Sequence, residues 1–328
     1  MRQPFDAVIL IAFGGPLGPG DIRPFLGNVL RGRRVAPERV DEVARHYELF
    51  NGVSPITELT RRQAEGLRAA LEAGGSPLPV YMGMRNWHPY LRETMHRMAE
   101  DGVRRAIGFI MAAHRSYSSC TQYRENVRDA RAELLAAGVA APELTYVNDW
   151  HAHAGYVETC ARHIVAAIER LPPTLRPHAR IVFTAHSIPV EMAERYPYRE
   201  QLLETARMVA GRINAADWAL VYQSRSGRPE DPWLGPDICD YLRAERAQGL
   251  RSAVLAPVGF VSDHIEVLYD LDTEAASVCR QIGVEMARAE AANADAVFVQ
   301  MMADVVHATS ARYADGRPLP LAMPAAAR

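Results

Sequence analysis

The chain is short of cysteine, of net charge and of long apolar runs, and each shortage excludes a class of protein. Four cysteines occur among 328 residues, 40 or more residues apart, so no CxxC metal clip exists and ordinary thiols in a reducing compartment are expected. The formal net charge of −2 gives no electrostatic reason to bind nucleic acid, and no basic tract indicates an anionic membrane. No run of about 18 apolar residues offers a transmembrane segment.

Common nucleotide, hydrolase and metalloprotease motifs are also missing. Gly14-Gly15-Pro16 follows the first strand-like run but fits neither GxGxxG nor GxxxxGK[ST], and no seryl nucleophile motif, HExxH or zinc ribbon occurs. The opening residues pass directly into that first apolar run, which is too short for a signal-sequence core followed by a cleavage site, so we expect no signal sequence there. We therefore expect a cytoplasmic enzyme.

The remaining pattern is that of an α/β protein. Hydrophobic residues make up 48% and charged residues 23% of the chain, as in soluble globular proteins. Short apolar runs alternate with longer amphipathic stretches, which predicts parallel sheets with helices on both faces. The predicted strands are 6–12, 79–83, 105–112, 143–148, 179–185, 218–223 and 252–258. The predicted helices are 57–74, 90–102, 124–137, 156–170, 199–214 and 294–309.

This pattern occurs twice, which predicts two halves joined near residue 150. The segment 149–155 reads as the connection, so we expect an N-terminal half over 1–149 and a C-terminal half over 150–328. The second half contains an acidic segment and the predicted C-terminal helix, and the tail 316–328 is expected to be loose. Ligands of open parallel sheets lie beyond the carboxyl ends of the strands, and the polar residues described next cluster there.

An acidic row follows the last predicted strand. Glu266, Asp270 and Glu274 are spaced by four residues, which places three carboxylates on one face of a helix. Like charges repel in this arrangement, so a divalent cation passing along the row would explain it, because carboxylates are hard oxygen ligands. A solvated acidic face is the alternative, and the spacing alone leaves it open.

Two histidines extend this candidate site. His186 ends a predicted strand and can accept a proton near neutral pH, although a histidine bonded to nearby backbone is the ordinary alternative. His264 lies two residues before Glu266, so the two side chains face the same side only if the backbone is extended or irregular. His114 is a weaker candidate of the same kind. An arginine patch and one large aromatic could line a cleft for a flat, carboxylate-bearing ligand: Arg31, Arg33, Arg34 and Trp233.

At these residues the chain resembles the ferrochelatases, and in particular their actinobacterial-type branch. The matching segments are 13–16, 52–56, 184–189, 222–225, 232–236 and 257–274, and the branch is indicated by 85–87 and 117–123. The resemblance implies two similar Rossmann-like, chelatase-like halves with a porphyrin cleft between them. It also implies that Fe²⁺ enters a porphyrin and two protons leave, with coproporphyrin III as substrate and coproheme as product in that branch.

The resemblance also assigns roles to single residues. His186 and Glu266 match the pair that faces the macrocycle and the metal, and Asp270 and Glu274 match an acidic ladder that the family forms on a π-helical turn. His186 is expected to be the base and Glu266 to neutralise the incoming dication. The expected substrate-binding residues are Phe13, Arg31, Arg33, Arg34, Ser54, Tyr123, Trp233 and His264.

Departures from the family limit what carries over. Phe13 stands where some relatives place a tyrosine that can ligate iron, so an axial phenolate is excluded there. Cys160 lies near a cluster-ligand position, but no cysteine follows Cys279, so a [2Fe–2S] cluster is not expected and no cofactor is needed beyond the substrate Fe²⁺. Expected partners are porphyrin, ferrous iron and a downstream heme-pathway enzyme, with no nucleic acid, and the expected state is a monomer.

Three alternatives to this reading remain open in the sequence. They are a protoporphyrin IX ferrochelatase, a non-catalytic tetrapyrrole or metal carrier, and a cobalt chelatase. A cleft for coproporphyrin needs donors for four carboxylates rather than two. The arginines with Ser54 would supply one side, and Tyr123 or Arg124 another. No long apolar insertion near residues 30–50 forms a lip suited to a vinyl-bearing substrate, which favours coproporphyrin.

Overall fold

Two separate parallel sheets form the framework of the protein. The computed structural model describes residues 4–32, 35–226, 228 and 230–314. The N-terminal sheet has the order β2-β1-β3-β4, with β1 (Ala7–Ala12), β2 (Val80–Met84), β3 (Arg105–Ile110) and β4 (Glu143–Tyr146). The C-terminal sheet repeats this order as β6-β5-β7-β8, with β5 (Arg180–His186), β6 (Trp218–Gln223), β7 (Ser252–Ala256) and β8 (Glu285–Arg288). All pairs of neighbouring strands are parallel.

Each sheet buries both faces, and this explains why its strands are continuously apolar. In β1, Val8 and Leu10 face one core, whereas Ile9 and Ile11 face another, as the two-residue period of a strand requires. The second core of the N-terminal sheet is closed by α4 (Leu91–Glu100) and α5 (Gln122–Ala136). The corresponding face of the C-terminal sheet is closed by α9 (Ile238–Ala247) and α11 (Ala276–Ile282).

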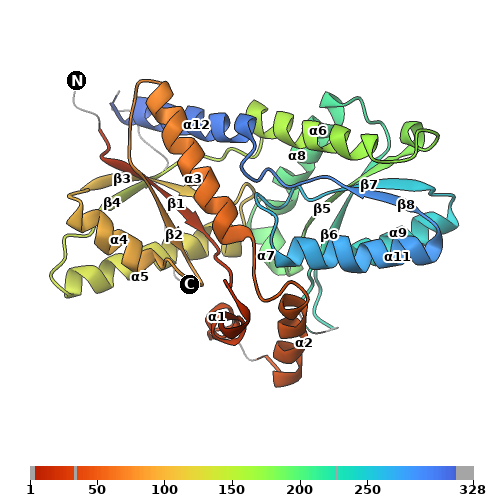
Figure 1. Cartoon of the computed structure of the whole chain (residues 1–328), viewed down its shortest axis with the longest axis horizontal. Coiled ribbons are helices and arrows are strands. Elements are labelled where there is room, and N and C mark those ends of the chain that lie inside the picture. The colour runs from red at the N-terminus through yellow and green to blue at the C-terminus, as the bar shows by residue number, and fades with distance from the viewer. Residues whose placement is uncertain (1–3, 33–34, 227, 229, 315–328) are drawn as a thin grey trace.

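A shared core joins the two halves. It includes residues of β1, β3, β5 and β7, together with α3 (Ile56–Ala73), α6 (Ala154–Glu169) and α8 (Tyr198–Arg212). The last helix, α12 (Ala296–Ala314), buries Phe298, Met302 and Val306 in this core and packs on both α3 and α6 (Figure 1). The C-terminal helix therefore ties the two sheets together.

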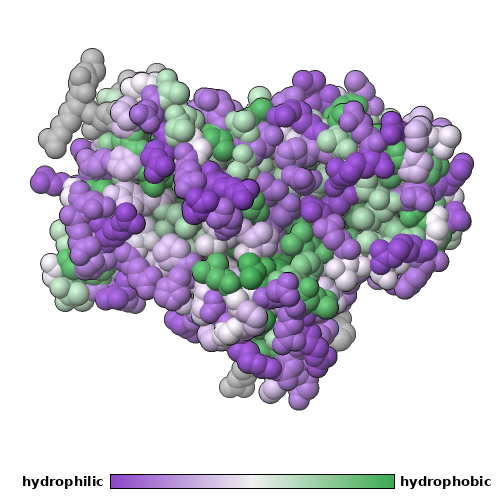
Figure 2. All heavy atoms as spheres, in the orientation of Figure 1, coloured by the Kyte–Doolittle hydropathy of each residue, from purple (hydrophilic) through white to green (hydrophobic). Residues whose placement is uncertain are grey.

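Two short helices stand apart from the sheets. The helices α1 (Ile22–Val29) and α2 (Pro37–Glu48) protrude at the bottom of Figure 1 and enclose a small core of their own. Ile265, from the beginning of the acidic segment, also belongs to this core. Figure 2 shows hydrophobic residues gathered where these helices meet the body of the molecule. Three exposed apolar side chains lie in the segments that border them: Leu17, Leu49 and Val53.

A π-helix follows the third strand of each half. In the N-terminal half, η2 (Tyr117–Thr121) precedes α5. In the C-terminal half, α10 (Ile265–Val267) runs into η4 (Leu268–Ala275), which precedes α11. The π-helical form expected for the acidic segment is therefore confirmed. The wider turn admits an extra residue per hydrogen-bonded ring and is often found at functional sites.

The predicted strands are confirmed to within two residues at each end, but β8 was not predicted. The expected boundary at residues 149 and 150 falls in the loop between β4 and α6 and remains a prediction. The tail that was expected to be loose lies outside the described residues. Among the residues that the structure describes, no helix is both long and apolar enough to cross a membrane.

Candidate active site

His186 occupies the carboxyl end of the central strand β5. The next residues, Ser187 to Pro189, leave the sheet and are held by two neighbouring loops. The Ser187 backbone N–H donates to the Gln223 carbonyl at 2.8 Å, and the Ser187 hydroxyl donates to the Leu234 carbonyl at 2.7 Å. Tyr198 donates its phenol to the carbonyl of His186 at 3.0 Å. The imidazole therefore projects from a backbone fixed on three sides.

The hydrogen bond of His186 defines its tautomer. Its Nδ1 is bonded to the Ser187 carbonyl oxygen, which can only accept. Nδ1 must therefore carry the hydrogen, and in the neutral ring Nε2 holds the lone pair. Nε2 lies 3.8 Å from Oε2 of Glu266 and is the nitrogen that can take a proton.

Glu266 lies between two imidazoles. Its Oε2 is 3.8 Å from His186 Nε2 and 3.5 Å from His264 Nε2. His264 has an extended backbone, with φ −151° and ψ 177°, directly before α10. This conformation brings its side chain next to that of Glu266, two residues further along the chain. Burial opposes ionisation of Glu266, but the hydrogen bond from His264 and the positive charge that His186 carries when it is protonated outweigh burial and lower the pKa of Glu266 to about 2. Glu266 is a carboxylate at neutral pH.

Asp270 is the second acid of the row and is held by the end of β6. Gln223 donates to its Oδ2 at 3.2 Å, and the hydroxyl of Ser224 bonds to the same oxygen. Ser224 has φ +60°, a left-handed conformation that is uncommon for serine, and this turns the chain immediately after the strand. Burial, together with the charges of Glu266 and Glu274, raises the pKa of Asp270 to about 7 despite these hydrogen bonds.

Glu274 forms the outer end of the row. Burial and the charge of Asp237 raise its pKa, whereas a hydrogen bond from Tyr269 opposes that rise. Tyr269 is itself stacked on His46 of α2, with ring centroids 3.6 Å apart and planes 12° from parallel. The protruding helix α2 thus contacts the acidic row across the boundary between the halves.

A buried ion-pair network anchors the segment that carries these acids. Arg288, the last residue of β8, lies 2.8 Å from Asp263 and 2.7 Å from Asp272. Asn293 donates to Asp263 at 2.9 Å and accepts from its backbone N–H at 2.8 Å. Because Asp263 precedes α10 and Asp272 lies in η4, the network fixes both ends of the turn that presents Glu266 and Asp270.

Close backbone approach also shapes this edge. A Cβ on Gly259 would lie 2.4 Å from the Cβ of Ala185, so only glycine lets the loop after β7 pass the end of β5. This approach brings the His186 and Glu266 loops together.

Of the expected substrate-binding residues of the N-terminal half, Phe13 follows the end of β1 and Tyr123 lies at the beginning of α5. Phe13 is half-buried, and its carbonyl accepts from the backbone N–H of Asn86 at 3.0 Å. The guanidinium of Arg85 lies 5.9 Å from the ring centroid of Phe13 and 5.5 Å from that of Tyr123. Tyr123 is buried at 5% exposure in the core under α5. Arg124 lies 4.8 Å over the ring of Tyr146.

The other expected substrate contacts are distributed around this edge. Ser54 is buried beside Gly15, and its backbone N–H donates to the Pro16 carbonyl at 2.9 Å. Arg31 is exposed and donates to Asn28 at 2.8 Å. Trp233 is half-buried in the loop that pairs with Pro189, next to the His186 turn. The expected contacts Arg33 and Arg34 lie outside the described residues.

The structure identifies site residues that the sequence argument did not single out. Gln223 and Ser224 hold Asp270, and His46 holds Tyr269. Polar residues directly after a strand are the signal that could have identified the first two, because strand ends of parallel sheets carry ligand sites. Nothing in the local sequence indicates His46. His114, the weaker candidate, is buried, and burial lowers its pKa to about 3, so it is a neutral core histidine.

The arrangement can accept a proton and attract a cation at adjacent points. A neutral Nε2 faces an ionised carboxylate, and two further acids continue from that carboxylate along a π-helix. Within the described ranges no three His, Cys, Asp or Glu side chains converge closely enough to hold a metal ion. The acids form a row and not a cage.

Comparisons with known proteins agree on one family. The family model described as Ferrochelatase matches residues 5–310. A protein of Rhodopirellula baltica named Ferrochelatase is 45% identical over 304 residues, covering 92% of this chain and 86% of the relative. Relatives named Coproporphyrin III ferrochelatase include one from Mycolicibacterium paratuberculosis, 47% identical with coverage of 92% and 87%, and one from Streptomyces coelicolor, 43% identical with coverage of 93% and 85%.

A solved structure shows the same fold without close sequence similarity. The sirohydrochlorin chelatase SirB of Bacillus subtilis subspecies spizizenii, in complex with cobalt, superposes with a TM-score of 0.55 at 9% identity, covering 97% of this chain and all of that one. The likeness supports two Rossmann-like halves and says nothing about substrate.

Proposed function

The chain belongs to the ferrochelatase family, and from this premise we propose that it inserts Fe²⁺ into coproporphyrin III to give coproheme. The substrate is supported by relatives of 43–47% identity that are named Coproporphyrin III ferrochelatase. The observation that carries the chemistry is the pair His186 and Glu266, whose Nε2 and Oε2 atoms face each other at 3.8 Å.

His186 is the proposed base. A free-base porphyrin holds two N–H protons, and both must leave as Fe²⁺ binds the four nitrogens. The bond between Nδ1 and Ser187 leaves Nε2 as the acceptor, and the resulting imidazolium is stabilised by the carboxylate of Glu266. The proton then passes to solvent, which restores the neutral ring for the second transfer.

The acidic row is the proposed route for the metal. Carboxylate oxygens suit a hydrated divalent cation, and Glu266, Asp270 and Glu274 offer them in succession. Glu266 stays ionised, whereas Asp270 is about half protonated near neutral pH because its pKa is about 7. A proton on Asp270 must leave before a cation can use that carboxylate fully.

The porphyrin is proposed to contact six of the described residues: Phe13, Arg31, Ser54, Tyr123, Trp233 and His264. Arg33 and Arg34 are proposed to bind its propionates. The porphyrin would lie between the halves 1–149 and 150–328. We further propose a cytoplasmic monomer that needs no [2Fe–2S] cluster and passes its product to a downstream enzyme.

Metal insertion in solution tests the proposal. The purified protein is mixed anaerobically with coproporphyrin III and Fe²⁺, or with Zn²⁺ in air, and the absorption bands of the metalloporphyrin are followed. We expect catalytic formation above a protein-free control. Tight porphyrin binding without turnover would instead identify a carrier, and turnover restricted to another tetrapyrrole would reject coproporphyrin as substrate.

A further inference from the structure

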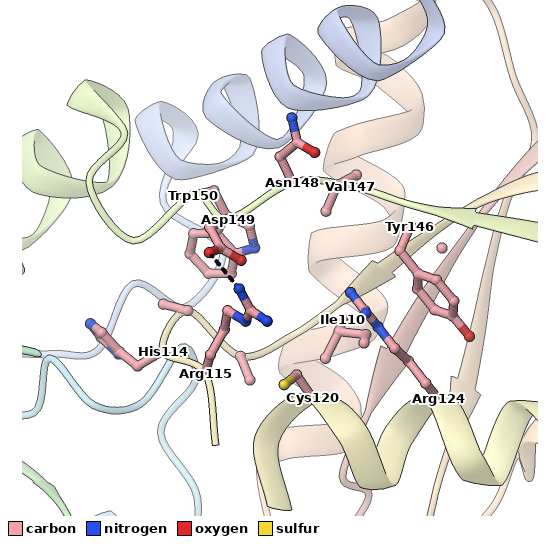
Figure 3. Close-up of a pocket in the computed structure, with 13 residues that line it drawn as sticks. Ile110, His114, Arg115, Cys120, Arg124, Tyr146, Val147, Asn148, Asp149 and Trp150 are labelled. Atoms are coloured by element: carbon pink, nitrogen blue, oxygen red, sulfur yellow. Dashed lines mark hydrogen bonds and ion pairs between the residues drawn. The ribbon is translucent and has the colours of Figure 1, made fainter. Parts of the chain in front are cut away.

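A small cavity lies at the carboxyl ends of β3 and β4, in the half opposite the acidic row. Its volume is about 30 Å³, room for one or two water-sized particles. Figure 3 shows Arg115 and Arg124 reaching toward the same space from opposite sides, with Cys120 between them. The carboxyl edge of a parallel sheet is where small ligands bind in this class of fold.

The two arginines differ in how their charge is balanced. Arg115 lies 3.4 Å from Asp149, a carboxylate that also accepts from Gln201 at 3.1 Å. Arg124 forms no ion pair within the described part of the chain, and its Nε is buried without a hydrogen-bond acceptor. It is instead stacked on Tyr146 at 4.8 Å. A half-buried guanidinium without an anion is costly, because its desolvation is not offset.

The other titratable groups around the cavity do not supply the missing charge. His114 is neutral because burial lowers its pKa to about 3, and Tyr146 is neutral because burial raises its pKa to about 12. Cys120 donates its thiol hydrogen to the Ser116 carbonyl at 3.0 Å. Two arginines and one aspartate leave the lining with a net charge of +1.

The matching place in the C-terminal half shows what is missing. The two sheets have the same strand order, so β3 and β4 correspond to β7 and β8, and a π-helix follows the third strand in both. There, Arg288 meets two carboxylates, Asp263 and Asp272, at 2.8 and 2.7 Å. In the N-terminal half the last residue of β4 is Tyr146 instead of an arginine, and Arg124 of α5 lies over the ring of Tyr146 without a carboxylate partner in the described part of the chain.

We propose that this cavity binds one small inorganic anion of about the size of chloride between Arg115 and Arg124. The anion neutralises the charge of Arg124, as Asp263 and Asp272 neutralise that of Arg288 in the other half. Through Cys120, which belongs to η2 and lines the cavity, the anion also stabilises the position of η2. That segment contacts the C-terminal half, where Thr121 donates to the phenol of Tyr196 at 3.3 Å. Anion binding therefore strengthens a contact between the halves.

Thermal unfolding of the complete protein tests the proposal. The melting temperature is measured in increasing sodium chloride against sodium gluconate of the same ionic strength, since gluconate is too large for the cavity. Chloride binds the folded protein only, so we expect a saturable rise of about 2–4 °C that gluconate does not give. Arg124→Gln should abolish the difference between the salts.

A neighbouring arginine provides the matched control. Arg131 lies on the same helix α5 and is also half-buried with an unpartnered Nε, but it does not line the cavity. Arg131→Gln should keep the full chloride response. An equal loss in both variants, or no difference between the salts in the unaltered protein, would overturn the proposal. Crystals soaked in sodium bromide give an independent readout, in which an anomalous peak between Arg115 and Arg124 supports an anion and its absence indicates water.

Discussion

The carbonyl of Ser187 decides which nitrogen of His186 can act as a base. Because it fixes the hydrogen on Nδ1, the lone pair of Nε2 points toward Glu266. His186→Ala should reduce metal insertion at least a hundredfold, since general bases contribute about 10²–10⁴. Porphyrin affinity should stay within about tenfold, because no wall of the site is lost. Single-turnover absorption and fluorescence quenching measure the two quantities.

One control variant keeps this prediction specific. His178→Ala removes an exposed histidine of the same half and should leave turnover unchanged. Turnover of His186→Ala above a tenth of the unaltered protein would move the base elsewhere. His264, 3.5 Å from Glu266, would then be tested next.

Asp270 gives the site a pH dependence near neutrality. Its pKa of about 7 is caused by burial and by the charges of Glu266 and Glu274. The protonated form does not attract a dication, so the apparent KM for metal should fall as pH rises through about 7. Asp270→Asn should have a weaker metal affinity that does not change across this window. A metal KM with the same pH profile in both proteins would contradict the assignment.

Asp270 also makes the stability of the protein depend on pH, but in the opposite direction to its effect on metal affinity. An unfolded aspartate has a pKa of about 3.9, so the folded chain holds an extra proton between about pH 4 and pH 7. Stability therefore falls as pH rises through that window. Asp270→Asn should raise the free energy of unfolding at pH 8 by on the order of 2 kcal/mol, since each pKa unit corresponds to about 1.4 kcal/mol. Urea unfolding at pH 5 and pH 8 measures the difference.

Single residues were predictable where their chemistry depended on spacing. His186 stood at a strand end, and the acids stood four apart, so the sequence located both. The meeting of His264 with Glu266 needed an extended residue directly before a helix, and this backbone change leaves no compositional trace. Gln223 and Ser224 were visible as strand-end polar residues, but their partner Asp270 lies 46 residues or more away.

At the scale of elements, the π-helix decides how the acids are presented. Glu266 stands on the short α10, beside His186, whereas Asp270 and Glu274 lie on η4 and extend away from it. Glu266→Gln should therefore lower kcat. Asp270→Ala and Glu274→Ala should raise the apparent KM for metal more than that for porphyrin. Steady-state kinetics with each substrate varied in turn separates these effects.

A charge-matched control belongs with this series. Glu285→Ala removes an exposed acid of β8 in the same half and should leave both KM values unchanged. Equal increases in the two KM values for the ladder variants would indicate a structural acidic face, the alternative that the spacing left open.

Strands with a continuous apolar run were predictable from the sequence, whereas the short strand β8, which has no such run, was not. The four residues of β8, Glu285–Arg288, contain two charged side chains and only one fully buried residue, so no apolar run marks the strand. It forms because β7 offers an open edge and Arg288 is pulled in by Asp263 and Asp272. Tertiary pairing, which local sequence does not encode, decides this strand.

At the scale of the whole molecule, the two halves share a core but divide the chemistry. The proposed base, the carboxylate beside it and the acidic row all come from the C-terminal half, whereas the proposed porphyrin contacts Phe13, Arg31 and Ser54 come from the N-terminal half. The absence of a long apolar insertion near residues 30–50 favoured coproporphyrin. The exposed side chains of Leu17 and Val53, which lie on paired segments next to Ser54, add apolar surface there, and an apolar surface does not by itself distinguish the two porphyrins.

Charged donors must then decide the substrate. Coproporphyrin carries four carboxylates and protoporphyrin IX two, and Arg31, Arg33 and Arg34 are the proposed donors on one side of the site. We expect kcat/KM for coproporphyrin III to exceed that for protoporphyrin IX by at least about tenfold, or roughly 1.4 kcal/mol of transition-state stabilisation. Parallel insertion assays with both porphyrins measure the ratio.

Removing the proposed donors should lower the ratio of the two kcat/KM values, mainly by lowering kcat/KM for coproporphyrin III. In the double variant Arg31→Ala with Arg33→Ala, kcat/KM for coproporphyrin III should fall, and that for protoporphyrin IX should change less, because it has fewer carboxylates to lose contact with. Arg207→Ala with Arg251→Ala removes the same charge from exposed positions of the other half and should leave the ratio intact. A preference for protoporphyrin IX in the unaltered protein would reject the substrate while leaving metal insertion itself in place.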